Sequence, residues 1–183
     1  MTDTELVNRA RAGDHDAFAV LVRHAIPRLY GAAKLILRQP DRAEDAVQDA
    51  LVLAWRDIRA LREPGAWEAW LYRLTIRACH RSASVHRHHD VAELSPDDVP
   101  HVEHDFAGAL GDRDRLRRQL QRLPMDQRTV IVLHFYLDLP LSDAAQILGV
   151  PIGTAKSRLH RALEQMRMSM GTKDGAVPAE RRS

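Results

Sequence analysis

Hydrophobic residues in the first part of the chain recur every three or four positions, which is the spacing of amphipathic helices. The pattern runs from Phe18 to Ile36, and it returns from Ala46 to Ile58 and from Trp67 to Ala78. Pro27 lies inside the first run and predicts a kink or a local break there. Because no segment shows a convincing strand-period alternation, we expect an all-α fold.

Polar residues between these runs predict where the helices begin. Asp41 and Glu44 follow Pro40 with the spacing of a capping box, in which a side-chain acceptor and a carboxylate three residues later satisfy backbone N–H groups. Residues 63–65, with the sequence Glu-Pro-Gly, predict a turn before the third helix.

The helical spacing stops at residues 86–105, which are rich in carboxylates and histidines and poor in large apolar side chains. That composition is typical of a linker. Helical spacing returns over residues 106–169, where Pro124 suits the start of a new helix. We therefore predict two small helical domains, at residues 1–85 and 106–169, joined by a flexible acidic, histidine-containing linker at 86–105. Residues 170–183 have the composition of a disordered tail.

A helix-turn-helix pattern occupies the end of the second predicted domain. A short apolar helix near residues 142–148 is followed by Gly149, which suits a tight turn, and by Pro151, which suits the start of a second helix. We expect the second helix to bury Ile152, Ala155, Leu159, Ala162, Leu163 and Met166. Its other side chains carry hydroxyls and cations suited to the major groove of DNA. An ordinary basic helix exposed to solvent would show the same spacing.

Composition and charge narrow the class of protein. The chain has 183 residues, of which 45% are hydrophobic, and its formal net charge is only +2. Its apolar runs are shorter than the roughly 18 residues that cross a bilayer, and its first residues are polar and acidic, unlike a signal peptide. Cys79 is the single cysteine, which excludes an internal disulfide and fits a reducing compartment. We expect a cytoplasmic protein with no direct membrane insertion.

The second domain resembles region 4 of the extracytoplasmic-function (ECF, group 4) sigma factors of the sigma-70 family. The resemblance is carried by LPMDQRTV at residues 123–130 and by LGVPIGTAKSRLHRA at residues 148–162. Asp143 and Ala144 stand where the family commonly has Glu and Ile. The resemblance implies that the helix-turn-helix binds the −35 promoter element, with contacts from Thr154, Lys156, Ser157, Arg158, His160 and Arg161.

The first domain resembles region 2 of the same family. AEDAVQDALVLAWR at residues 43–56 is similar to the helix with which sigma factors grip the β′ subunit of RNA polymerase. The resemblance implies polymerase binding through Asp45, Gln48, Asp49, Leu53 and Trp55. A charged face exposed to solvent is the alternative interpretation of the polar residues in this segment.

AWLYRL at residues 69–74 and the preceding loop resemble the part of region 2 that recognises the −10 element and helps to separate the DNA strands. Cations and aromatic rings suit single-stranded DNA. The implied contacts are Arg62, Trp67, Tyr72, Arg73, Arg77 and Arg81, although Trp67 and Trp70 are also typical core residues. Arg77 stands where the family often has Asn, and because Arg only donates hydrogen bonds, the family's base preference does not transfer.

The resemblance implies a sigma factor that binds core RNA polymerase through its β′ and β subunits and binds promoter DNA, both duplex and single-stranded. It also implies control by an anti-sigma factor, and it implies no cofactor or bound metal. The acidic linker either threads through polymerase or is a solvated tether. The histidines at positions 86, 88, 89, 101 and 104 lack the spacing of a zinc site. Cys79 suits a small buried side chain.

Two other classes of protein compete with this interpretation. A conventional helix-turn-helix regulator would explain the second domain, but it leaves the patterns at 43–56 and 69–74 without a role, and the chain shows no heptad repeat for a dimer. An enzyme would need a recognisable catalytic motif, and the sequence has no phosphate-binding glycine loop, nucleophile elbow or HExxH helix. We therefore expect a protein that is not an enzyme.

Overall fold

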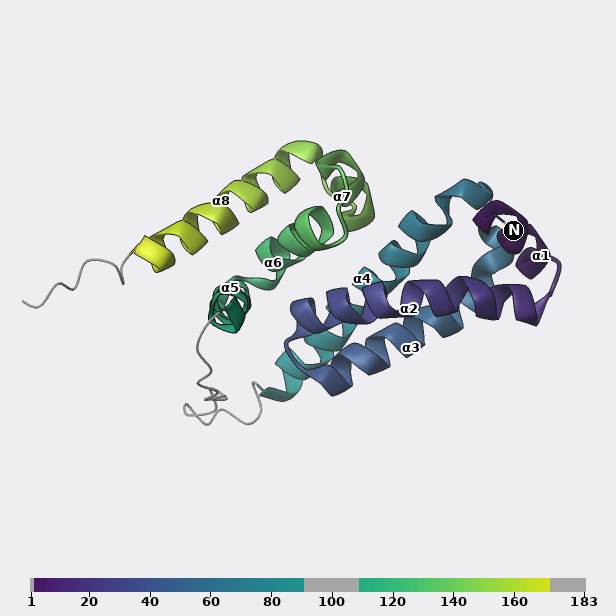
Figure 1. The fold of residues 1–183 in the computed structure, drawn as a ribbon, viewed down its shortest axis with the longest axis horizontal. Coiled ribbons are helices and arrows are strands. Elements are labelled where there is room, and N and C mark those ends of the chain that lie inside the picture. The colour runs from purple at the N-terminus through teal and green to yellow at the C-terminus, as the bar shows by residue number, and fades with distance from the viewer. Residues whose placement is uncertain (1, 91–108, 172–183) are drawn as a thin grey trace, which may run out of the picture.

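The computed structural model of the chain describes residues 2–90 and 109–171, and the residues that it describes form helices and turns without any β-strand (Figure 1). This confirms the predicted all-α fold. The first lobe contains α1 (Asp3–Arg11), α2 (His15–Leu37), α3 (Pro40–Asp57) and α4 (Trp67–Asp90), with short 3-10 turns at Ile58–Ala60 and Pro64–Ala66. The second lobe contains α5 (Ala109–Arg122), α6 (Met125–Ile131), the π-helical turn Val132–Tyr136, α7 (Leu141–Leu148) and α8 (Ile152–Gly171).

Side-chain caps fix the beginning of the first lobe. Thr2 and Glu5 form a capping box, in which the backbone N–H of Glu5 donates to Thr2 Oγ1 over 3.3 Å and that of Thr2 donates to Glu5 Oε2 over 2.8 Å. Asp14 caps α2 by accepting from the backbone N–H of Ala17 over 3.0 Å. That hydrogen bond, followed by the one from Arg9, lowers the pKa of Asp14.

The structure corrects two expectations about helix limits. Of the kink or local break expected at Pro27, the break does not occur, because α2 continues from His15 to Leu37 through this residue. Pro27 is exposed, and water can therefore hydrate the carbonyl that the proline leaves without a donor. The capping box expected at Asp41 and Glu44 is also absent, because α3 already begins at Pro40, after Gln39 at the N-cap without a side-chain hydrogen bond. Proline suits this first position because its fixed φ matches the helix.

Small side chains bring α2, α3 and α4 close together. The buried face of α3 is largely alanine, and its buried residues are Ala43, Ala46, Val47, Ala50 and Ala54. Leu29 and Ile36 of α2 and Leu71 of α4 fill the space between the helices and are fully buried. Burying a side chain of this size contributes about 1.5–3 kcal/mol. The first lobe therefore has a closely packed core beneath the side chains on its surface.

The turn of the helix-turn-helix has the conformation that its sequence predicts. Gly149 ends α7 with a left-handed φ of 66°, and the backbone N–H of Val150 donates to the carbonyl of Ala145 over 3.1 Å. Ala155, Ala162 and Met166 of α8 are buried, as predicted, and Leu159 and Leu163 are partly buried. Ile152 was wrongly predicted as buried. It is 48% exposed because it lies one turn before Ala155, the first buried residue of the helix.

The two lobes lie against each other (Figure 1). Helices α6 and α7 of the second lobe contact α2 and α4 of the first. Helix α4 continues to Asp90, past the predicted domain limit at residue 85, whereas most of the predicted linker and residues 106–108 lie outside the described part of the chain. The tail at 172–183 lies outside it as well. Within the described ranges, no helix is long and apolar enough to span a bilayer.

Candidate nucleic-acid and polymerase interface

Helix α8 presents most of the predicted −35 residues to solvent. Lys156, Ser157, His160 and Arg161 are exposed, whereas Thr154 is half-buried. The Ser157 hydroxyl donates to the carbonyl of Thr154 over 2.9 Å, which leaves its lone pairs free to accept a further hydrogen bond. Residues 152–163 contain no carboxylate, so this surface of the helix is positively charged and suited to DNA phosphates.

Among the predicted −35 residues, Arg158 forms an ion pair within the second lobe. Its Nη2 lies 2.8 Å from Asp126 Oδ2 of α6, and its side chain is only 25% exposed. This ion pair ties α8 to α6 within the second lobe. A phosphate contact by Arg158 would compete with the Asp126 carboxylate for this side chain, so its role differs from that of Lys156 and Arg161.

The solvent-facing side of α3 carries the predicted polymerase-binding residues. Asp45, Gln48 and Asp49 are exposed. Gln48 and Asp49 follow Asp45 by three and four residues, which places both beside Asp45 on the helix surface. Val52 extends this face, is 67% exposed, and was missed by the sequence analysis. The helical spacing of the sequence could have indicated this position, because Val52 follows Gln48 by four residues and Asp49 by three. The face therefore combines carboxylates with an apolar side chain.

The other two predicted polymerase-binding residues are less accessible. Leu53 and Trp55 are half-buried. The ring of Trp55 packs against His15, with centroids 4.2 Å apart, and against Phe18, with centroids 5.0 Å apart. Their packing leaves Asp45, Gln48 and Asp49 as the accessible part of the predicted set.

The predicted −10 residues divide into exposed arginines and buried aromatic rings. Arg62, Arg77 and Arg81 are exposed, and Arg73 is half-buried. Arg73, Arg77 and Arg81 recur every four residues along α4, so they form one basic stripe. The Nε of Arg73 is buried and has no hydrogen-bond partner among the described residues.

Trp67 and Tyr72 lie in the interior, where they are 3% and 4% exposed. The Trp67 ring packs against Phe18, with centroids 6.0 Å apart, and against Trp70 at 5.8 Å. Trp67 is thus a core residue in this conformation. A core position was the alternative to a DNA contact that its sequence allowed. Neither ring offers a free face on which a base could stack.

The predicted polymerase and −10 surfaces meet between α3 and α4. Arg81 Nη2 lies 3.4 Å from Asp49 Oδ2, and both side chains are more than half exposed. An ion pair this exposed contributes little to stability, on the order of 0–1 kcal/mol. It is therefore easily exchanged for contacts with a partner or with a phosphate.

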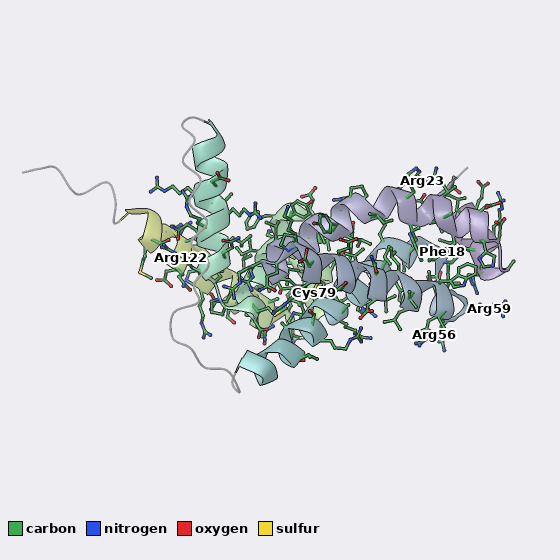
Figure 2. The ribbon with its side chains drawn as sticks, turned by 90° about the horizontal axis from the view of Figure 1, so that it is seen from below. Phe18, Arg23, Arg56, Arg59, Cys79 and Arg122 are labelled. Atoms are coloured by element: carbon green, nitrogen blue, oxygen red, sulfur yellow. The ribbon has the colours of Figure 1, made fainter. Side chains whose placement is uncertain are left out.

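Two further exposed arginines lie at the end of the first lobe that is remote from Arg122 (Figure 2). Arg59 precedes Arg62 by three residues, and Arg56 pairs with Asp57 over 2.8 Å. Neither arginine was predicted as a contact from the sequence, although the Arg-x-x-Arg spacing of residues 59 and 62 was visible. Arg59 adds an exposed cation in the short turn Ile58–Ala60, before α4.

Cys79 and the histidines form no site in the described part of the chain. Cys79 is fully buried, as predicted, and burial raises the pKa of its thiol to about 12. Residues 2–90 and 109–171 contain no group of His, Cys, Asp and Glu side chains that could hold a metal. The side chains of His86, His88, His89, His101 and His104 lie outside the described residues.

Comparison with known proteins identifies both lobes. The family model for Sigma-70 region 2 matches residues 21–88, and that for Sigma-70 region 4 matches residues 113–166. The ECF RNA polymerase sigma factor SigM of Mycobacterium tuberculosis is 34% identical over 170 residues, which cover 93% of this chain and 85% of SigM. The ECF sigma factor SigW of Bacillus subtilis is 29% identical, over 90% of this chain and 94% of SigW.

Solved structures agree with these relatives. The sigma factor RpoE of Bartonella quintana, crystallised with the anti-sigma factor NepR, matches with a TM-score of 0.70 and 29% identity, over 85% of this chain and 98% of RpoE. CnrH, solved with the cytosolic domain of CnrY, has the same fold with a TM-score of 0.69 and 23% identity, over 93% of this chain and 98% of CnrH. The chain therefore belongs to the ECF sigma factors of the sigma-70 family and acts in promoter recognition by RNA polymerase.

Proposed function

We propose that this sigma factor makes three functional contacts through three separate surfaces. Helix α8 binds the −35 element, the arginines of α4 and the preceding turn bind the −10 element, and the polar face of α3 binds core RNA polymerase. The observation that carries the proposal is that exposed side chains of suitable chemistry lie in both matched regions of one chain.

The chemistry of α8 suits duplex DNA. An α-helix fits the major groove, which is about 12 Å wide, and cationic side chains there bind phosphates or the O6 and N7 atoms of guanine. Lys156 and Arg161 are exposed and free to make such contacts, while Ser157 and Thr154 suit short hydrogen bonds. The Arg158–Asp126 ion pair helps to hold the helix in position.

The α3 face suits a protein partner. Its carboxylates would pair with basic side chains of a helix on the β′ subunit, and Val52 would supply apolar area at the centre of the contact. The second lobe would contact the β subunit. These contacts would place both DNA-binding surfaces on the polymerase.

The first lobe would bind the −10 element mainly through positive charge. Arg62, Arg73, Arg77 and Arg81 would hold the phosphates of a separated strand, and Arg59 would extend this track. Trp67 and Tyr72 are buried and support this surface from the core. Opening of the promoter is thus assisted by capture of the single strand.

This chain would supply specificity rather than catalysis, because bond formation belongs to the polymerase. We propose that it works in the cytoplasm and that an anti-sigma factor controls it, as the complex of RpoE with NepR suggests. The domain limits at residues 85, 106 and 169 remain our proposed division of the chain.

Binding to core polymerase tests the docking face. We expect Asp45→Ala with Gln48→Ala to lower the affinity for core polymerase at least about tenfold, because both side chains lie at the proposed contact. Pull-down with purified core enzyme measures the effect. Asp16→Ala, which removes an exposed carboxylate from α2, is the matched control and should bind normally.

The same experiment separates this proposal from a conventional helix-turn-helix regulator. Such a regulator would bind DNA but not polymerase. Failure of the unmodified chain to bind core polymerase would support the regulator. Normal binding by the double variant would place the docking surface elsewhere on the molecule.

A further inference from the structure

Arg158 lies within the proposed −35 surface of α8. It follows Thr154 by four residues and precedes Arg161 by three, so the three side chains emerge on the same side of the helix. The Arg158 side chain is nevertheless only 25% exposed, whereas Arg161 is exposed. Arg158 thus lies beside residues that are proposed to contact DNA, while its own side chain is partly covered.

The carboxylate that meets Arg158 comes from a different helix. Asp126 lies in the first turn of α6, which packs against α8 in the second lobe (Figure 1). Asp126 Oδ2 lies 2.8 Å from Arg158 Nη2, and the Asp126 side chain is 53% exposed. Among the residues that the structure describes, no other cation of α8 forms an ion pair. The fold therefore gives one cation of this surface a carboxylate partner.

The ion pair restricts the Arg158 side chain more than it stabilises the lobe. An ion pair in which one partner is more than half exposed contributes little to the free energy of unfolding. An unrestrained arginine loses rotamer freedom when it binds a partner, and a side chain that is already held in one orientation loses less. The contact at Nη2 therefore prepares the guanidinium for one direction of approach.

The ion pair also changes which part of DNA suits Arg158. Contacts to phosphates depend on positive charge, and the Asp126 carboxylate offsets the charge of the guanidinium and repels phosphates. Contacts to a base edge depend instead on the direction of the N–H donors. Arginine has five such donors, and a single contact at Nη2 leaves enough of them for the O6 and N7 acceptors of guanine. The paired side chain is therefore better suited to guanine than to phosphate.

We propose that Asp126 is a positioning residue for promoter recognition. It orients Arg158 toward a guanine of the −35 element and keeps this arginine away from the phosphates, which are the same in every DNA sequence. Asp126 thereby strengthens the preference for one base pair without contacting DNA itself. This role rests on the proposed binding of α8 to the −35 element, and it adds a residue of α6 to those that determine specificity.

The base preferences of the holoenzyme test this role. Core polymerase with this chain is bound to a promoter that it uses, in which the −35 region is randomised, and the bound DNA is sequenced. Asp126→Asn keeps the shape of the side chain and removes its charge. We expect the preference for guanine at one position to fall about tenfold or more, since a bidentate arginine contact discriminates between bases by roughly tenfold to a hundredfold. Preferences at the other positions should remain.

Two further variants show whether Asp126 acts through Arg158. Arg158→Ala should lose the preference at the same position, and adding Asp126→Asn to it should change nothing more, because both substitutions remove one and the same contact. Glu164→Gln is the matched control, because it removes an exposed carboxylate of α8 that forms no ion pair within the described ranges. It should leave every base preference unchanged.

The salt dependence of DNA binding gives a second readout. In Asp126→Asn the guanidinium of Arg158 is free to bind a phosphate, so the slope of log affinity against log salt concentration should become steeper by about 0.9. Arg158→Ala should show no such increase. Loss of a merely structural ion pair would lower the melting temperature without steepening the slope. We expect the melting temperature of Asp126→Asn to stay close to that of the unmodified chain.

The outcomes separate this role from the proposed function. A holoenzyme that selects no promoter would contradict the proposed function and, with it, the role of Asp126. If the unmodified holoenzyme prefers a −35 sequence and Asp126→Asn prefers the same sequence equally strongly, the role of Asp126 is refuted and the proposed function stands. Equal weakening at all positions, together with a lower melting temperature, would also refute it, because the ion pair would then only hold α6 to α8.

Discussion

The proposed DNA-binding surfaces of the two lobes differ in how accessible they are. On α8 of the second lobe, Lys156, Ser157, His160 and Arg161 are exposed. In the first lobe Arg62, Arg77 and Arg81 are exposed and Arg73 is half-buried, but the rings of Trp67 and Tyr72 are almost completely buried. The second lobe thus presents its proposed DNA contacts to solvent, whereas the first presents positive charge while its aromatic rings are buried.

This difference separates two kinds of residue within a motif. Side chains on the exposed face of a motif can bind a partner, and side chains on its inner face hold that surface in place. The segment at 69–74 contains both kinds, because Arg73 belongs to the basic stripe and Tyr72 points into the interior. Substitution of an exposed residue of the motif should therefore weaken partner binding, whereas substitution of a buried one should lower the stability of the lobe.

The largest expected effect is that of Trp67→Ala. The ring is 3% exposed and packs against Phe18 and Trp70, so we expect its removal to lower the free energy of unfolding by about 3–5 kcal/mol. Chemical denaturation followed by circular dichroism measures this loss. A variant that kept its stability and lost only −10 recognition would show that Trp67 is a DNA contact rather than a core residue.

The next effect is on promoter binding by the second lobe. Lys156→Ala with Arg161→Ala should weaken binding of the −35 element about tenfold to a hundredfold and leave the unfolding free energy within about 0.5 kcal/mol. Binding titrations at several salt concentrations should also show a shallower salt dependence, since two cations are lost.

Affinity for core polymerase is the control for this double variant. It should be unchanged, because both residues lie outside the α3 face. Loss of polymerase binding would contradict the proposed division of labour between the two lobes.

The sequence predicted the helices and the exposed cations better than it predicted contacts over long distances. The helical spacing of apolar residues, together with Gly149 and Pro151, predicted α7, the turn and α8. Such glycine and proline positions are local signals in the sequence. The family resemblance implied that Trp67 and Tyr72 contact DNA, but a resemblance does not show which rings face inward in this chain. The contact between Gly31 and Tyr136 joins residues more than 100 positions apart, and neither residue carries a local signal for it.

The smallest of these effects is expected at the turn of the helix-turn-helix. Gly149→Ala places a side chain on a residue with a φ of 66°, where nothing lies within 4 Å of the added Cβ atom. Only backbone strain opposes the change, and we expect a loss of about 1–2 kcal/mol in unfolding free energy. A matched change, Gly153→Ala, meets open space within α8 and should be neutral or stabilising.

Equal stabilities for the two glycine variants would show that the turn is not strained in the way that its φ indicates. A lower melting temperature for Gly149→Ala alone would confirm that the position of α8 depends on this turn.

Transcription in a purified system shows whether this chain selects promoters. Core RNA polymerase is combined with this chain and with DNA from the chain's own genome, and the transcript starts are mapped. We expect starts at a defined set of promoters that share −35 and −10 sequences, and we expect Lys156→Ala with Arg161→Ala to abolish most of them. Starts that do not change when the chain is added would contradict the proposed function.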